Sequence, residues 1–339
     1  MVSQLREAAL HVLPGLLLLF VVGIAARIGA GYVPVVNYLI LAVVLGAVLV
    51  NLFGLPAWAS AGVSSHKLLL EAGIVLMGAR ISLAAVSDAG PKIVVLVVAT
   101  VAFTAILTEL LSRNVFGLAN KMGSLMASGA AICGVSAIVA VAGGIDAKKD
   151  QIAFAVATIL LFDAVTLFVY PILGTILNLQ DVVFGVWAGL SMFSTGPVAA
   201  AGFAYSDTAG QWATMTKLTR NLFIGLAVIA YAGYYARAES KTGTVDRPLG
   251  LFWQNFPKFV LGFVAMMVIA NVGILSDGQL ATLENSYKWL FLFAFAGLGM
   301  GINVDEMRAT GFRPVLLTLT ALTIVSITTL VVVSALFGV

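Results

Sequence analysis

Apolar runs of about 20 residues recur along almost the whole of this 339-residue chain, separated by short polar links. Runs of this length can cross a hydrocarbon core of about 30 Å as helices, which satisfy their own backbone hydrogen bonds. Hydrophobic residues make up 61% of the sequence and charged residues only 10%, whereas soluble domains carry about a quarter charged residues. The chain is therefore predicted to be an all-α, polytopic membrane protein.

Proline, glycine and charged residues divide the sequence into about 11 predicted spans, which we treat as one transmembrane domain over residues 1–339. An apolar run after an early Arg is compatible with a cleaved signal peptide, but we expect a retained first span. The predicted spans lie near 10–30, 33–53, 66–86, 91–113, 121–145, 151–178, 182–203, 212–236, 250–272, 285–304 and 311–338.

The distribution of basic residues predicts the orientation. With the N-terminus inside, the inside loops hold 10 Lys and Arg residues and the outside loops hold 8. Three of the outside residues, Arg80, Lys217 and Arg220, lie close to or within spans, where a basic residue reports function rather than topology. The positive-inside rule then favours an inside N-terminus and an outside C-terminus.

An internal similarity indicates inverted repeats. The segments "GARISLAAVSDAG" (78–90) and "GMGINVDEMRATG" (299–311) align without gaps at an offset of 221. Each joins two consecutive predicted spans, and the two pairs are seven spans apart. An odd separation gives the two pairs opposite orientations, as in inverted-repeat transporters. The alternative is that hairpins bounded by glycine resemble one another by chance.

Two segments rich in small residues, "ASGAAICGVSAIVAVAGG" (127–144) and "GLSMFSTGPVAAAG" (189–202), predict two discontinuous helices. We expect the first break between Ser128 and Ser136, with backbone amides available to a ligand. A half-helix N-terminus attracts an anion, whereas the alternative reading is close packing of small residues between spans. The substrate-binding candidates are Ser128, Ala131, Ile132, Cys133, Gly134, Ser136, Ser191, Ser194, Thr195, Gly196 and Pro197.

Three charged residues within the predicted spans are further candidates. Asp163 lies in the middle of its span with no basic residue nearby in sequence, which makes it a candidate coupling residue that carries a proton, or a carboxylate bonded to a neighbouring threonine. Lys217 and Arg220 are three residues apart and share a helix face. They are predicted either to anchor at the headgroups or to supply the positive charge of an anion site and pair with Asp163.

The order of these motifs resembles the YeiH family of bacterial inner-membrane proteins, often called sulfate exporters. The resemblance covers about residues 66–320 and is most specific at the Ile-Cys-Gly element, 132–134, and the Lys-x-x-Arg element, 217–220. It implies inverted repeats and a relation to bile-acid and auxin carriers. It also implies a His, an acidic residue and a Gln where this chain has Phe193, Ser194 and Pro197. Because this chain lacks the His and the acidic residue, these two cannot take part in coupling here. Their absence fits a subgroup of the family with another substrate.

The leading hypothesis is a secondary active transporter of a small anion, such as sulfate or a sulfonate, that works by alternating access. An ion-coupled organic-acid symporter, a channel, a membrane sensor or scaffold, and an intramembrane enzyme are the alternatives. We expect no enzymatic activity, because the sequence has no GxSxG or HExxH motif. We expect no cofactor, metal or nucleic acid; the expected partners are the anion, the bilayer and a coupling proton or sodium ion, and a homodimer is an open option.

Overall fold

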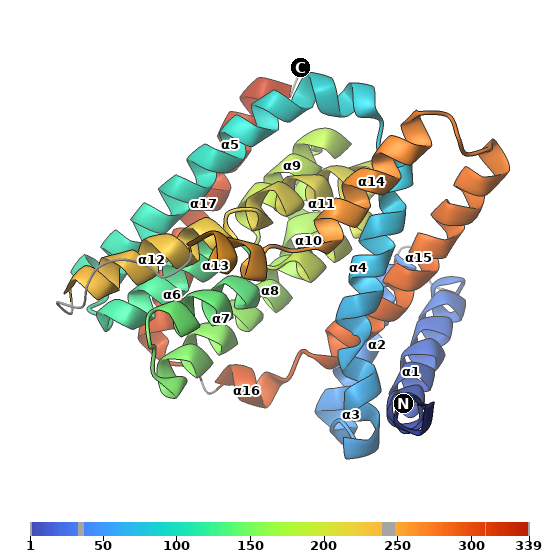
Figure 1. Cartoon of the computed structure of the whole chain (residues 1–339), viewed down its shortest axis with the longest axis horizontal. Helices are drawn as coiled ribbons and strands as arrows, with labels where there is room; N and C mark the ends of the chain where they lie inside the picture. Colours follow the sequence, from blue (N-terminus) through green and yellow to red (C-terminus); the bar gives the residue numbers. More distant parts are fainter. Residues whose placement is uncertain (1, 33–36, 239–247, 309, 338–339) are drawn as a thin grey trace. The chain divides into compact units, whose positions relative to one another are not determined.

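A computed structural model describes residues 2–32, 37–238, 248–308 and 310–337, and every regular element in these ranges is helical. The helices pack into two compact units (Figure 1). Unit 1 comprises Met1–Asp88 and Lys258–Val304, and unit 2 comprises Ala89–Pro257 and Asp305–Val339. The chain thus passes between the units three times. The prediction of an all-α protein is confirmed for the described residues.

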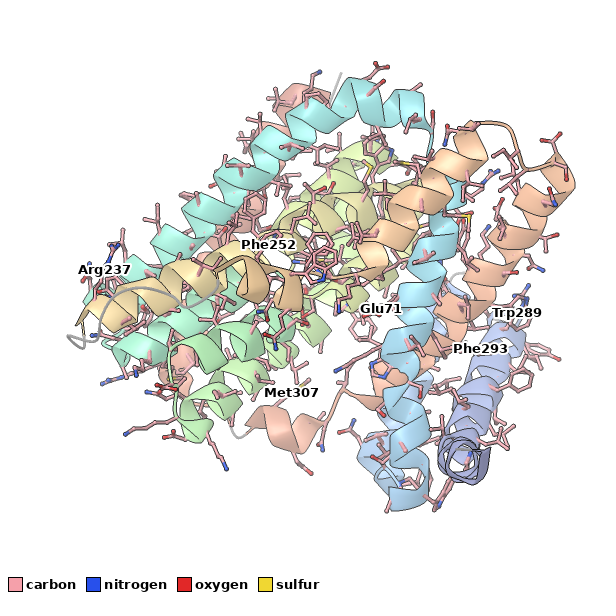
Figure 2. All side chains as sticks on the ribbon, viewed as in Figure 1. Glu71, Arg237, Phe252, Trp289, Phe293 and Met307 are labelled. Atoms are coloured by element: carbon pink, nitrogen blue, oxygen red, sulfur yellow. The ribbon has the colours of Figure 1, made fainter. Side chains whose placement is uncertain are left out.

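Unit 1 is built around α15 (Asp277–Met300), which packs against α1 (Val2–Ala30), α2 (Tyr38–Phe53) and α4 (His66–Met77). Figure 2 shows Trp289 and Phe293 on α15; the guanidinium of Arg27 lies 4.3 Å from the Trp289 ring centroid, and Phe20 packs on Phe293. The unit also contains α3 (Ala57–Ser64), a 3-10 turn at Gly78–Arg80 and α14 (Phe259–Asn271).

Unit 2 holds most of α5 (Leu83–Leu110) and a π-helical turn at Leu111–Val115. Its other helices are α6 (Asn120–Ala131), α7 (Val135–Gly144), α8 (Lys149–Ile176), α9 (Asp181–Ser191), α10 (Thr195–Tyr205), α11 (Asp207–Asn221), α12 (Ile224–Ala238), α13 (Pro248–Asn255), α16 (Val304–Arg308) and α17 (Phe312–Phe337).

Four of the described helical segments are long and apolar enough to cross a membrane: Val12–Ala30, Val86–Val115, Lys149–Ile176 and Phe312–Phe337. They coincide with the predicted spans near 10–30, 91–113, 151–178 and 311–338. The expected spans at 212–236 and 250–272 are each divided, between α11 and α12 and between α13 and α14. These shorter helices follow from polar residues and turns that interrupt the apolar runs.

The predicted span 121–145 is corrected by the structure, because this segment folds back on itself. Lys121, at the start of α6, donates from Nζ to the carbonyl oxygen of Asp146, just after α7, at 3.5 Å. Further along, a Cβ added to Gly129 would lie 2.9 Å from the Ile138 side chain. The antiparallel helices α6 and α7 therefore form a hairpin, which we call the first hairpin, with its tip at Ile132–Gly134.

The predicted span 182–203 is corrected in the same way. The rings of Phe184, near the start of α9, and Tyr205, at the end of α10, stack with their centroids 4.0 Å apart. The Tyr205 hydroxyl donates to the carbonyl oxygen of Leu179. Helices α9 and α10 thus form a second hairpin with its tip at Met192–Ser194.

Both hairpin tips meet the middle of α8. A Cβ added to Gly134 would lie 3.1 Å from Cγ2 of Ile159, and the Ser194 amide donates to Oδ1 of Asp163 at 3.0 Å. The first hairpin has its base next to the start of α8, whereas the base of the second lies next to its end. The hairpins therefore enter unit 2 from opposite ends and meet halfway.

Candidate functional site

The first tip requires glycine at position 134. Gly134 has φ +67° and ψ −126° and precedes the first residue of α7. A residue with a Cβ is strained at this φ, and the added Cβ would also collide with Oγ of Ser194 on the second tip. The break between Ser128 and Ser136 predicted from the sequence is confirmed, since α6 ends at Ala131 and α7 begins at Val135.

The second tip is an extended stretch whose last residue, Ser194, immediately precedes α10. Its amide is one of the donors that a helix start leaves unpaired, and the Asp163 carboxylate accepts from it. Pro197 follows in the first turn of α10, where its missing amide donor costs no intrahelical hydrogen bond. Pro197 therefore starts α10 rather than kinking a continuous helix.

Arg220 binds the carbonyl ends of α6 and α9. Its Nη2 donates to the carbonyl oxygens of Ala130 and Ala131 at 2.8 and 2.9 Å, and its Nη1 donates to those of Gly189, Leu190 and Met192 at 2.6–3.0 Å. These are among the acceptors that a helix C-terminus leaves unpaired. A fully buried guanidinium is stabilised by such a complete set of partners.

Lys217 joins the two tips directly, because its Nζ donates to the carbonyl oxygens of Ile132 at 2.6 Å and Met192 at 3.0 Å. The side chain is 0% exposed, so the headgroup-anchor interpretation of Lys217 and Arg220 is wrong. Among the described residues no ion pair joins Asp163 to a basic side chain. The predicted pairing of these cations with Asp163 is therefore replaced by pairing with helix carbonyl ends.

The electrostatics of the tips favour an anion. Each helix end carries about half an elementary charge, negative at the C-termini of α6 and α9 and positive at the N-termini of α7 and α10. Lys217 and Arg220 outweigh the two negative ends, and Asp163 offsets one positive charge. Counted formally, with Lys217 and Arg220 both protonated, the junction has an excess of about one positive charge when Asp163 is ionised, and about two when Asp163 is protonated.

The predicted binding residues do not all reach this junction. Ser136 is exposed at the start of α7 and Thr195 is half-buried at the start of α10. Ser194 is half-buried as a residue, but its Oγ atom is buried. Cys133 is buried in the first tip and Gly196 in the first turn of α10. Ser128 and Ser191 instead donate to carbonyls of their own helices, Leu125 and Trp187. They pack within the hairpins rather than at the tips.

Asn221 belongs to the site, although sequence reasoning missed it. Its Nδ2 donates to Oγ1 of Thr195 at 3.0 Å, and its side chain is 4% exposed. This bond fixes the hydroxyl at the first residue of α10. A polar residue directly after Arg220, on a helix that already carries two candidate basic residues, was the signal that could have identified it.

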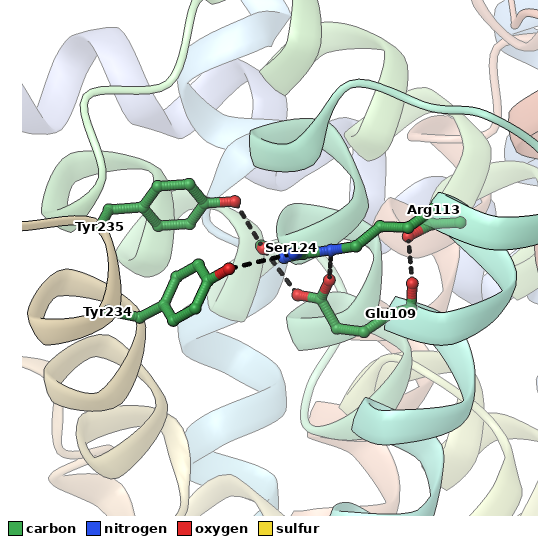
Figure 3. A network of polar contacts seen from close by, with 6 residues as sticks. Glu109, Arg113, Ser124, Tyr234 and Tyr235 are labelled. Atoms are coloured by element: carbon green, nitrogen blue, oxygen red, sulfur yellow. Dashed lines mark hydrogen bonds and ion pairs between the residues drawn. The ribbon is translucent and has the colours of Figure 1, made fainter. Parts of the chain in front are cut away.

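A second polar network lies at the base of the first hairpin (Figure 3). The Glu109 carboxylate accepts from Nε of Arg113 at 2.8 Å and from Oγ of Ser124 at 2.6 Å. Ser124 also hydrogen-bonds to Tyr235, and Arg113 donates to Tyr234. Glu109 and Arg113 are four residues apart and form an ion pair. The network ties α5, α6 and α12 together.

Comparison with known proteins places the chain in a family. Residues 14–318 match the family model described as "Conserved hypothetical protein 698". A UPF0324 membrane protein of Nitratidesulfovibrio vulgaris is 31% identical over 91% of this chain and 89% of its own length. The chain belongs to the YeiH/UPF0324 family. UPF0324 membrane proteins of Bartonella henselae and Clostridium tetani are 31% and 30% identical, over 87% and 74% of this chain and 83% and 75% of their own lengths.

The family resemblance predicted from the sequence is therefore confirmed. No solved structure matches the chain, so the relation to bile-acid and auxin carriers stays a prediction. The UPF0324 relatives are bacterial membrane proteins by name, which agrees with the apolar helices of this chain.

Proposed function

We propose that this UPF0324 protein is a secondary active transporter of a small anion, such as sulfate or a sulfonate, across the bacterial inner membrane. The observation that carries the proposal is the junction of the two hairpin tips. Lys217 and Arg220 hold the carbonyl ends of α6 and α9, and Asp163 binds the Ser194 amide. In this proposal the remaining amides in the first turns of α7 and α10 are the donors offered to the anion. Neutral hydroxyls on Ser136, Ser194 and Thr195 add donors that can release the ligand again.

In this proposal both hairpins are re-entrant: each enters the membrane and returns to the same side. Helical breaks at membrane depth are tolerated where they are buried in protein or line a cavity, and transporters place substrate sites at such breaks. With two expected spans replaced by hairpins, the segments 78–90 and 299–311 lie five crossings apart instead of seven. That separation is still odd, so the inverted-repeat prediction stands.

The hairpin topology also strengthens the proposed orientation. In this topology Lys148 and Lys149 are counted at the inside base of the first hairpin instead of in an outside loop. Lys217 and Arg220 are counted in the membrane interior and drop out of both totals. The inside count of Lys and Arg rises from 10 to 12, and the outside count falls from 8 to 4. An inside N-terminus and an outside C-terminus follow from the positive-inside rule.

Cysteine labelling tests this topology. In a chain with Cys133 replaced by Ser, we expect Lys121→Cys and Asp146→Cys to react with a membrane-impermeant maleimide only from the cytoplasmic side. Asp181→Cys and Ser206→Cys should react only from the outside. Labelling of residues 121 and 146 from opposite sides would mean that this segment crosses the membrane and would refute the hairpin topology.

Transport itself is tested in proteoliposomes. We expect uptake of radiolabelled sulfate or taurine against a gradient of protons or sodium ions, with competition by unlabelled anions naming the substrate class. Uptake of a dicarboxylate alone would favour the ion-coupled organic-acid symporter. No uptake of any anion under all gradients, by protein that is folded and correctly inserted, would refute the proposal and leave a sensor or scaffold.

Asp163 is the proposed coupling residue, since a proton on it raises the positive charge of the junction. Asp163→Asn mimics the protonated state, so we expect tighter anion binding and binding that varies less with pH than in the native chain. Isothermal titration of the purified variant with sulfate at several pH values measures both. Asp150→Asn, on the exposed first turn of α8, is the matched control. An unchanged pH profile in Asp163→Asn would remove its coupling role.

A further inference from the structure

Two asparagines in unit 1 make the same set of hydrogen bonds at two places far apart in the chain. Asn271, the last residue of α14, donates from Nδ2 to the carbonyl oxygen of Ile81 and accepts at Oδ1 from the Leu83 amide, at 2.8 and 2.9 Å. Asn51, near the end of α2, donates to Ile302 at 2.6 Å and accepts from Val304 at 2.9 Å. Each amide therefore spans one backbone break.

The two sets correspond residue by residue. Ile81 and Leu83 align with Ile302 and Val304 at the offset of 221 found in the sequence, and Asn51 and Asn271 differ by 220. Each asparagine also donates to the carbonyl four residues before it, Ala47 or Met267. The asparagine of each half binds the break in the other half, which is the reciprocal pairing that a two-fold axis produces.

Close backbone contacts repeat the same correspondence. An added Cβ at Gly78 would meet the carbonyl oxygen of Phe263 on α14, and one at Gly299 would meet that of Val43 on α2. Gly78 and Gly299 differ by 221, and Val43 and Phe263 differ by 220. Both glycines also accept a hydrogen bond from the residue three positions later, Ile81 or Ile302. Five pairs of contacts thus follow one symmetry.

The breaks lie where the chain leaves unit 1. Leu83 is the first residue of α5, which continues into unit 2 at Ala89, and Val304 is the first residue of α16, which continues into unit 2 at Asp305. The third passage, at Pro257–Lys258, follows α13. Because α5 is continuous across the unit boundary, bending of this connection falls at the non-helical residues Ile81 and Ser82, which Asn271 spans.

We propose that Asn51 and Asn271 are a symmetric pair of hinge pins about which unit 2 moves relative to unit 1. Each side chain holds both sides of a two-residue break, so the connecting helix pivots about a fixed point instead of fraying. A side-chain oxygen that accepts from the first amide of a helix also satisfies one of the donors that a helix start leaves unpaired. The proposal rests on the proposed function, because alternating access needs movement between two parts of the chain.

Hydrogen exchange measured by mass spectrometry tests the pins without any transport assay. We expect Asn271→Ala to speed exchange about fivefold around residues 81–86 and leave residues 302–306 unchanged. Asn51→Ala should do the reverse. Asn285→Ala, an exposed asparagine on α15 of the same unit, should change neither. Exchange that is unchanged at both breaks would overturn the proposal.

The hinge role needs a distance measurement between the units. Spin labels at Thr282→Cys in unit 1 and Thr175→Cys in unit 2, with Cys133 replaced by Ser, report the distribution of inter-unit distances by pulsed electron paramagnetic resonance. We expect each alanine variant to broaden the distribution and the double variant to broaden it further. Faster hydrogen exchange at the breaks with an unchanged distribution of inter-unit distances would mean that the asparagines only cap the local helices. That result would overturn the hinge.

Sulfate uptake in proteoliposomes then separates the two proposals. If the native chain transports, both variants should lose turnover several-fold while the sulfate dissociation constant stays the same. If the native chain does not transport but the distance distribution still responds to the asparagines, the transport proposal fails and the hinge stands.

Discussion

Replacing Arg220 with methionine is expected to lower the free energy of unfolding by about 3–5 kcal/mol, because several buried carbonyl acceptors lose their donor at once and each such loss costs about 1–3 kcal/mol. Methionine fills similar space but donates no hydrogen bond, so the carbonyl oxygens of Ala130, Ala131, Gly189 and Leu190 lose their partner. Thermal unfolding of the detergent-solubilised protein, followed by tryptophan fluorescence, measures the loss.

Two variants control this experiment. Arg237→Met removes an exposed arginine at the end of α12, labelled in Figure 2, and should leave the melting temperature close to native. Arg220→Lys keeps the charge but offers fewer donors in another geometry, so it should recover only part of the stability. A melting temperature of Arg220→Met equal to that of the native chain would show that the hairpin tips do not depend on this guanidinium.

Gly134→Val is expected to abolish transport while the protein is still produced and inserted. The β-branched side chain is strained at φ +67° and collides with the Ser194 hydroxyl, so the two tips cannot keep their contact. Gly143→Val is the matched control, because Gly143 lies on the same hairpin with nothing within 4 Å of an added Cβ. Uptake by proteoliposomes, normalised to inserted protein, compares the two.

A double variant isolates the collision from the backbone strain. Gly134→Ala should destabilise the protein, and adding Ser194→Ala should recover part of that loss, because it removes the Oγ atom that the new Cβ meets. The strain of a positive φ remains in both variants. If Ser194→Ala recovers none of the lost stability, the two tips are not in the contact that the structure gives them. Separately, full transport by Gly134→Val would refute the proposed site.

Hydropathy predicted the long helices well, because α5, α8 and α17 are continuous apolar runs. It could not distinguish a broken helix that continues from one that turns back. Both need about 25 apolar and small residues with glycine in the middle, as in residues 120–144. The deciding contacts, such as that between Lys121 and Asp146, join residues 25 positions apart, and no local pattern records them.

The chemistry of the site was predicted in part. The spacing of Lys217 and Arg220 placed both on one face of α11, and the break at Gly134 was readable from a glycine among small residues. Their partners were not readable, because backbone carbonyls carry no sequence signature. For Asp163 the sequence suggested a proton, a neighbouring threonine or the two basic residues of α11. Its hydrogen-bond partner in the structure is the Ser194 amide, which no sequence pattern indicates.

The hydrogen bonds between α11 and the first tip also have a consequence for co-translational assembly, because the two partners are synthesised at different times. Lys217 and Arg220 follow their partners Ala130, Ala131 and Ile132 by 85–90 residues. At a synthesis rate of about 5–20 residues per second, that gap lasts roughly 5–20 s. During this interval the carbonyl oxygens at the end of α6 have no basic side chain to bind them, so the first hairpin must stay near water or the insertion machinery. In the proposed re-entrant topology, this hairpin enters the bilayer fully only after α11 has been made.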